Sequence, residues 1–166
     1  GDGERKRLKF TYLNETTPLG TIGAVSLIED EESEHLLVMN ADVLSDVDFE
    51  DFFEFYTQSD ADMCIGSIPY QVKVPYGVLE VEQDNVTSLR EKPTYPYYSN
   101  GGIYFIKRRI KDQIPKETFY NATDLMTRLV AEKRKVTHYP ILGYWMDIGR
   151  YEDYVKVQED IKRIKF

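Results

Sequence analysis

Two aspartates in the chain each follow a run of apolar residues. Asp42 comes shortly after Leu36–Met39, and Asp147 directly follows the aromatic and apolar segment Tyr144–Met146. A carboxylate at the end of a buried strand is costly unless it is paired or bound to a metal. Carboxylates at the carboxyl ends of strands in one α/β sheet can meet in a ligand-binding crevice, where they suit Mg²⁺. The alternative is that Asp42 caps a turn and Asp147 caps the helix after it.

A second candidate for binding chemistry is the charged segment before Pro93. Glu91 can accept hydrogen bonds from hydroxyl groups, and Lys92 can neutralise a phosphate. Because a proline disfavours the helical region for the residue before it, we expect an extended backbone at Lys92. An ordinary charged strand end is the alternative interpretation.

Glycines at two places leave room for a ligand. Asn100, which can donate and accept hydrogen bonds, precedes Gly101 and Gly102, where a ligand can approach the backbone closely. Gly77 stands at the start of a predicted strand, where a missing side chain makes space for a bulky group. A plain turn that enters a strand would explain Asn100–Gly102 equally well.

Several other patterns predict no chemistry. The glycines of Gly1–Arg7 resemble a phosphate loop, but they lack the strand before and the helix after that would support it, so we predict a turn. Asp60 and Asp62 have the spacing of the Asp-X-Asp metal motif of glycosyltransferases. They precede their strand, however, and we predict a solvated loop. His35 and His138 stand alone, so no zinc site is expected.

The elements that must position these residues alternate between strand and helix. Periodicity predicts strands over residues 9–14, 36–40, 63–69, 78–83, 86–90, 103–106, 136–139 and 142–146, and helices over 19–28, 48–59, 121–134 and 151–164. The order predicts a single α/β domain over residues 1–166 with a mixed, mostly parallel sheet and flanking helices. The continuous apolar run at 36–40 predicts a strand covered on both faces, and Asp84-Asn85 predicts a hairpin turn.

Composition limits the classes of function. The chain has 166 residues, of which 42% are hydrophobic, and a net charge of -8, which argues against general nucleic-acid binding. The lone Cys64 favours a reducing compartment, and we expect the cytoplasm. No apolar run reaches the ~18 residues of a membrane-spanning helix, so no membrane partner is expected.

Five segments, taken in order, resemble one known family. They span residues 15 to 154 and read ETTPLGTIGAV, LLVMNADVL, YGVLEVEQDNVTSLREKP, SNGGIYFI and YWMDIGRYEDY. They are similar to the sugar-phosphate nucleotidyltransferases, including the mannose-1-phosphate guanylyltransferase-like branch. The resemblance implies a Rossmann-like fold and a Mg²⁺-dependent reaction in which a nucleoside triphosphate and a sugar-1-phosphate give an NDP-sugar and pyrophosphate.

The resemblance also implies roles for individual residues. Asp42 and Asp147 match the metal-binding aspartates of the family, and with Lys92 they form the expected catalytic set. The remaining positions match substrate-binding residues: Gly20 and Thr21 for the nucleotide base, and Gly77, Glu91, Asn100 and Gly102 for the sugar phosphate.

One family feature has no counterpart in the 166 residues. The family opens with a strand and a glycine-rich loop of the G-G-X-G-T-R-L type that holds the triphosphate, and no segment matches it. We therefore expect the chain to be the C-terminal portion of a catalytic domain, with little activity by itself and with exposed edges that favour self-association. The alternatives are a non-catalytic sugar-phosphate-binding or regulatory module and a glycosyltransferase.

Overall fold

The computed structural model of the protein describes residues 8–29 and 33–164. The strands are β1 (His35–Met39), β2 (Val43–Ser45), β3 (Met63–Lys73), β4 (Val78–Glu82), β5 (Asn85–Arg90), β6 (Thr94–Lys107), β7 (Val136–Pro140) and β8 (Trp145–Asp147). The helices are the 3-10 helix η2 (Gly23–Leu27) and the α-helices α1 (Phe49–Ser59), α2 (Arg108–Lys111), α3 (Ala122–Ala131) and α4 (Tyr151–Asp160). The turn predicted at Gly1–Arg7 lies outside the described residues.

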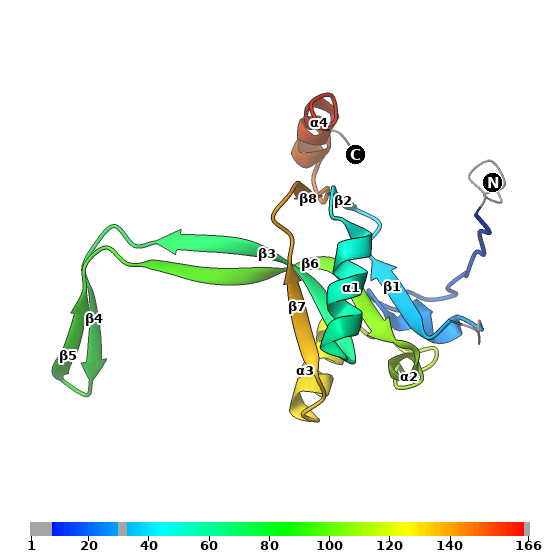
Figure 1. Ribbon diagram of the computed structural model, residues 1–166, viewed down its shortest axis with the longest axis horizontal. Helices are drawn as coiled ribbons and strands as arrows, with labels where there is room; N and C mark the ends of the chain where they lie inside the picture. Colours follow the sequence, from blue (N-terminus) through cyan, green and yellow to red (C-terminus); the bar gives the residue numbers. More distant parts are fainter. Residues whose placement is uncertain (1–7, 30–32, 165–166) are drawn as a thin grey trace.

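A four-stranded sheet forms the centre of the body (Figure 1). Its order is β1-β6-β3-β7, and β6 runs antiparallel to both β1 and β3, whereas β7 runs parallel to β3. Three of the four strands therefore point the same way. The predicted α/β class, with a mixed sheet and flanking helices, is confirmed.

Successive side chains of β6 point alternately into two hydrophobic clusters on opposite faces of the sheet. Ile103 and Phe105 face a cluster built with α1, while Tyr104 and Ile106 face a cluster built with α3. Phe52 of α1 and Leu125 of α3 are fully buried, and each such side chain contributes about 1.5–3 kcal/mol. The sheet is thus covered by helices on both faces along its middle strands.

Polar caps define where these two helices begin. Asp48 accepts hydrogen bonds from the backbone N–H groups of Glu50 and Asp51, at 2.9 and 3.0 Å, as the sequence predicts. At α3, Asn121 and Asp124 form a capping box. Helix α1 ends at Ser59, as predicted, whereas α3 ends at Ala131 rather than 134 and α4 ends at Asp160 rather than 164.

Strand β1 contradicts the expectation that both of its faces are covered. Leu37 and Met39 are 46% and 40% exposed. Among the described residues, the strand lies at the edge of the sheet and pairs with β6 alone. The apolar run therefore predicted the strand correctly, but the prediction that both of its faces are covered is wrong.

A two-stranded arm leaves the body and carries a hairpin at its far end (Figure 1). Strands β3 and β6 remain paired from Ser67 opposite Asn100 to Lys73 opposite Thr94, and β4 and β5 follow beyond them. The strands predicted at 63–69 and 103–106 are shorter than the observed β3 and β6. Apolar periodicity detects only the buried part of a strand, whereas the arm residues are held by pairing with each other.

Other boundaries differ for local reasons. Residues 9–14 are exposed and form no strand. Residues 19–28 form only η2, since Gly20 has a φ of +77° and packs directly on the backbone of Tyr120. The hairpin turn is at Gln83-Asp84 rather than Asp84-Asn85, and the strand predicted at 142–146 is the short β8. Among the described residues, no helix is long and apolar enough to cross a membrane.

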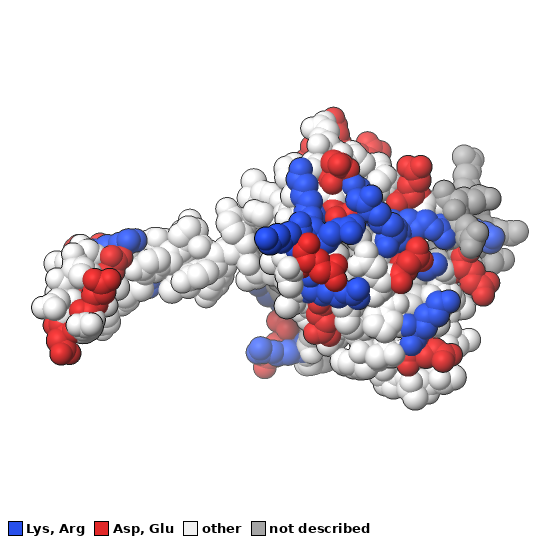
Figure 2. Space-filling model, turned by 90° about the horizontal axis from the view of Figure 1, so that it is seen from below, with Lys and Arg blue, Asp and Glu red and all other residues white. Residues whose placement is uncertain are grey.

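The two aspartates of the loop before β3 have different surroundings, although a solvated loop was predicted for both. Asp60 is solvated as predicted, with a side chain 85% exposed, but Asp62 is only 5% exposed. Arg109 Nη2 and Arg134 Nε donate to its two carboxylate oxygens at 2.6 and 2.7 Å. On the face of the body seen in Figure 2, lysine and arginine side chains are interspersed with aspartate and glutamate, in a chain whose net charge is -8. Asp62 therefore ties β3 to α2 and to the segment after α3.

We predict that Asp62→Asn destabilises the fold by about 2 kcal/mol, because the buried side chain loses its charge-assisted hydrogen bonds with Arg109 and Arg134. The hydrogen bond from Arg134, followed by that from Arg109, lowers the pKa of Asp62 to about 2 from the ordinary 3.8. A lowered pKa stabilises the fold above the unfolded value, so this contribution should be lost as the pH falls from about 4 to about 2. Urea unfolding at several pH values measures both effects. Asp60→Asn is the matched comparison: it removes the ion pair of an exposed carboxylate with Lys107 and should therefore cost much less stability than Asp62→Asn. Equal stability of the two variants would contradict the assignment.

Candidate active site

Pairing of β2 with β8 brings the two candidate metal ligands together. Val43 lies opposite Asp147, and the backbone N–H of Ile148 donates to the carbonyl oxygen of Asp42 at 2.8 Å. Asp42 and Asp147, distant in sequence, thus occupy neighbouring positions. Both residues are exposed, at the ends of strands that flank the sheet.

The alternative in which these aspartates act as caps is not supported. Helix α4 begins after Arg150 without a side-chain cap, so Asp147 does not cap it. Neither carboxylate forms a hydrogen bond or an ion pair with another residue in the described ranges 8–29 and 33–164. Within those ranges no three ligand-type side chains gather into a metal site. Two free carboxylates on neighbouring segments suit Mg²⁺, which takes one or two of them together with substrate phosphates and water.

The glycine pair of β6 lies against this aspartate pair. Asn40 N donates to the carbonyl oxygen of Gly102 at 2.9 Å, and Gly102 has a φ of +70°. The Asn40 amide occupies the space of a side chain at Gly102, since a Cβ there would lie 2.8 Å from Asn40 Nδ2. Trp145 Nε1 donates to the carbonyl oxygen of Gly101 at 2.8 Å. The glycines are therefore required for close approach by protein groups.

Asn100 is held beside these glycines by two hydrogen bonds. Its Oδ1 accepts from Gly102 N at 3.0 Å, and its Nδ2 donates to Tyr104 Oη at 2.8 Å. Burial raises the pKa of the Tyr104 phenol, so its hydroxyl stays protonated and can serve as that acceptor at neutral pH. The structure thus brings Asn100 and Gly102 next to the segments that carry Asp42 and Asp147.

Gly77, Glu91 and Lys92 gather elsewhere, where the arm meets the β4–β5 hairpin. A Cβ on Gly77 would lie 3.2 Å from Glu91 Oε2 and 3.1 Å from Leu89 Cδ1, so these residues are close neighbours. Lys92 has a φ of +44°, and the predicted extended backbone is wrong because the chain bends there between β5 and β6. The six-residue span from Ser67 to Lys73 corresponds to about 20 Å of strand. Figure 1 shows the hairpin at the far end of the arm from β2 and β8.

Gly20 and Thr21 lie at a third place, the N-terminus of α3. Thr21 Oγ1 accepts from Ala122 N at 2.9 Å, and Thr21 N donates to Asn121 Oδ1 at 3.3 Å. A Cβ at Gly20 would come within 2.6 Å of the carbonyl oxygen of Tyr120. Both residues therefore have a structural contact with α3 that sequence reasoning did not anticipate.

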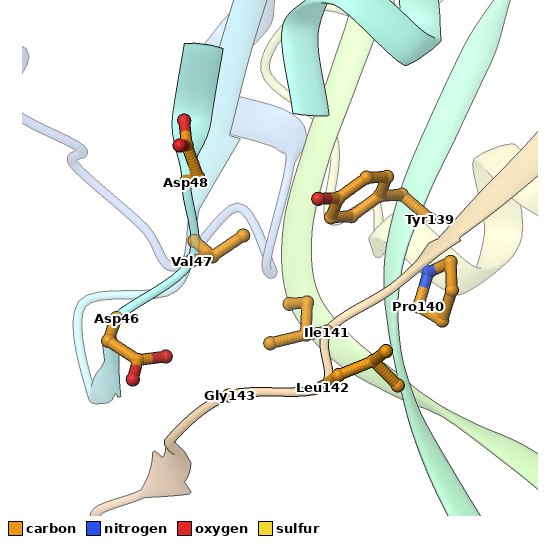
Figure 3. Close-up of a pocket in the computed structure, with 8 residues that line it drawn as sticks. All are labelled: Asp46, Val47, Asp48, Tyr139, Pro140, Ile141, Leu142 and Gly143. Atoms are coloured by element: carbon orange, nitrogen blue, oxygen red, sulfur yellow. The ribbon is translucent and has the colours of Figure 1, made fainter. Parts of the chain in front are cut away.

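A cavity of about 280 Å³ lies between the start of α1 and the segment from β7 to β8 (Figure 3). It is lined by Asp46, Val47, Asp48 and residues 139–143. Its carboxylates already have protein partners, since Asp46 accepts from Tyr144 N at 2.6 Å and Asp48 caps α1. The hydrogen bond to Asp51, ahead of burial, raises the pKa of Tyr139 to about 12. None of the candidate site residues lines this cavity.

Sequence reasoning missed two residues of this region, Asn40 and Trp145. Each stands two positions before one of the aspartates, and Trp145 is the single tryptophan of the chain. The sequence shows only that they flank the aspartates. Their contacts with Gly101 and Gly102 form between segments that are distant in sequence, so no local pattern predicts them.

Comparison with known proteins identifies the family of the chain. Residues 1–164 match the family described as Nucleotidyl transferase, and the chain belongs to that family. A mannose-1-phosphate guanylyltransferase of Mycobacterium tuberculosis is 28% identical over 98% of the chain and 47% of its own length. The curated relatives are about twice as long as the chain, which spans roughly half of each.

Solved structures show the same fold. HddC of Yersinia pseudotuberculosis is 28% identical, with a TM-score of 0.63 over 89% of the chain and 64% of its own, and it has also been solved with GMP-PN. A Bacillus anthracis protein solved with sucrose is 19% identical and has a TM-score of 0.73 over the whole chain and 70% of its own. The Rossmann-like nucleotidyltransferase fold expected from the resemblance is confirmed.

We predict that Mn²⁺, as a probe for Mg²⁺, quenches the fluorescence of Trp145, because this single tryptophan stands two residues before Asp147. Asp42→Asn and Asp147→Asn should each weaken Mn²⁺ binding at least about tenfold, since each removes one of two charged ligands. Asp84→Asn, at the tip of the hairpin, is the control and should leave the titration unchanged. Quenching that survives both site substitutions would place the metal elsewhere.

Proposed function

We propose that the protein, in its complete form, transfers a nucleotidyl group from a nucleoside triphosphate to a sugar-1-phosphate. The observation that carries this proposal is the pair of free carboxylates, Asp42 and Asp147, beside Asn100 and Gly102. Membership of the nucleotidyl transferase family supports it. The names of the relatives favour a guanylyl donor and a mannose-type sugar phosphate.

The chemistry requires orientation and charge neutralisation rather than a nucleophilic side chain. A phosphate oxygen of the sugar-1-phosphate attacks the α-phosphorus of the nucleotide, and the bond to the leaving pyrophosphate breaks. Mg²⁺ held by Asp42 and Asp147 would neutralise the phosphate charge. Lys92 pairs with the sugar phosphate, and Glu91 accepts hydrogen bonds from sugar hydroxyls.

The remaining candidate residues define the rest of the substrate site. Gly77 leaves space for the sugar next to Glu91, and Asn100 and Gly102 contact the sugar phosphate. Gly20 and Thr21 lie toward the nucleotide base. Because Gly77, Glu91 and Lys92 are on the arm and the aspartates are on the body, the sugar phosphate is bound between arm and body.

We expect little or no turnover by the 166-residue chain itself. None of its segments matches the glycine-rich loop with which the family holds the triphosphate. The lone cysteine favours a reducing compartment, and the cytoplasm is the proposed location.

Self-association is part of the proposal, since β1 presents an unpaired edge with Leu37 and Met39 exposed. Such an edge is a template for pairing with another strand. A second copy of the chain is the proposed partner at this edge.

Pyrophosphate release tests the activity, with a panel of nucleoside triphosphates and sugar-1-phosphates. It is measured on the 166-residue chain and on any longer form that the gene encodes. We expect turnover only where the glycine-rich loop is present, and Lys92→Ala should lower kcat/KM by about 10²- to 10³-fold. Lys73→Ala, on the exposed arm, is the matched control. A folded protein that binds sugar phosphate but shows no Mg²⁺-dependent nucleotide binding would instead indicate the non-catalytic module.

Light scattering tests self-association of the chain, whose monomer mass is 19.4 kDa. We expect a larger mass at high concentration and a monomer for Leu37→Lys, because a charge at an edge strand opposes pairing. Val130→Lys changes an even more exposed apolar residue, on α3, and should leave the mass unaltered. A monomeric wild type at every concentration would contradict the proposal.

A further inference from the structure

We propose that Asn40 and Trp145 are positioning residues that hold the two aspartates at a fixed place relative to the sugar-phosphate residues Asn100 and Gly102. This inference rests on the proposed function. It concerns how the site is assembled rather than which groups contact the substrate.

The two residues have matching positions. Asn40 stands two residues before Asp42, and Trp145 stands two residues before Asp147. Each is anchored on one member of the glycine pair in β6. Asn40 donates through its backbone to Gly102 and covers that glycine with its side chain, while Trp145 donates through its indole to Gly101.

The ribbon that carries the aspartates needs such anchors. Strands β2 and β8 pair over only three positions, and an isolated two-stranded ribbon is marginally stable at best. Its other end is closed by hydrogen bonds between Asp46 and Tyr144. Within the described part of the chain, the contacts of Asn40 and Trp145 are the hydrogen bonds that join the aspartate end to β6.

Trp145 is suited to this role by its chemistry. An indole donates one hydrogen bond and accepts none, and its partner here is a fixed backbone carbonyl. The ring also packs against the hydrophobic cluster that contains Phe52 and Ile103. Because alternate side chains of a strand share one side, Trp145 directs Asp147 toward the same region as the glycine pair.

The consequence is a rigid link between two binding functions. Asn100 is hydrogen-bonded to Gly102. The sugar-phosphate residue and the segments that carry both metal ligands are therefore all held by residues 100–102 of β6. Misplacement of reacting groups by about 1 Å can cost about 100-fold in rate. Coupling between metal binding and sugar-phosphate binding is therefore the property that these residues control.

Calorimetry tests the coupling with Mn²⁺ and mannose-1-phosphate as probes. In the wild type, the sugar phosphate should raise Mn²⁺ affinity, because its oxygens complete the metal coordination. Trp145→Phe keeps an aromatic ring, a smaller one, against the hydrophobic cluster and removes the N–H donor. We expect it to reduce this coupling about fivefold, as one lost hydrogen bond implies, and to change the affinity for Mn²⁺ alone by less than about twofold.

Tyr144→Phe is the matched control. It removes the hydrogen bond from the neighbouring aromatic residue to Asp160, 2.9 Å long, which points to α4 instead of β6. Thermal unfolding should show similar stability losses for the two variants, whereas only Trp145→Phe should lose coupling. Asn40→Ala is the second test. It keeps the backbone hydrogen bond to Gly102 and removes only the side chain that covers this glycine, so it should reduce the coupling to a smaller extent.

The outcomes separate this inference from the proposed function. Coupling that is reduced in Trp145→Phe and, to a smaller extent, in Asn40→Ala, and kept in Tyr144→Phe, supports the inference. Wild-type coupling that both Trp145→Phe and Asn40→Ala retain overturns the inference and leaves the proposed function standing. A wild type that binds neither Mn²⁺ nor mannose-1-phosphate overturns the proposed function, and the inference with it.

Discussion

Close approach of backbone segments at the glycines of β6 is the constraint on which the rest of the structure depends. A Cβ on Gly101 would lie 2.7 Å from the carbonyl oxygen of Gly66 in β3, and one on Gly102 would meet Asn40. Next to Gly66 the β3–β6 ladder shifts register, between Ile65 and Ser67. The central sheet, the arm and the aspartate-bearing ribbon all meet at this point. Larger side chains there would separate the parts that form the candidate site.

The acidic residues of the chain illustrate how context assigns different roles to one chemical group. Asp62 is buried and paired with two arginines, Asp48 caps a helix, and Asp42 and Asp147 have no protein partner in the described ranges. Asp42 lies in the turn between β1 and β2 and is exposed, so its charge remains solvated at little cost. A carboxylate after an apolar strand therefore need not be paired when the strand ends at the surface.

Much of the fold could be predicted because it depends on local patterns. The helix from Phe49 to Ser59 follows from its Asp48 cap and its aromatic face, and the apolar runs predict β1 and β7 closely. The same patterns failed where stability comes from distant partners. The arm continues through exposed residues such as Tyr70 because β6 pairs with it, and no periodicity reports that pairing.

The sequence by itself determined the family, the α/β class and the identity of Asp42 and Asp147 as a candidate pair, because residue types and their order carry that information. Only the tertiary structure decided that the pair is adjacent, that Asn40 and Trp145 anchor it, and that Gly77, Glu91 and Lys92 lie on a separate arm. The physical reason is that these relations depend on the register of strand pairs such as Val43 with Asp147. Register follows from packing between segments distant in sequence, so no single segment can specify it.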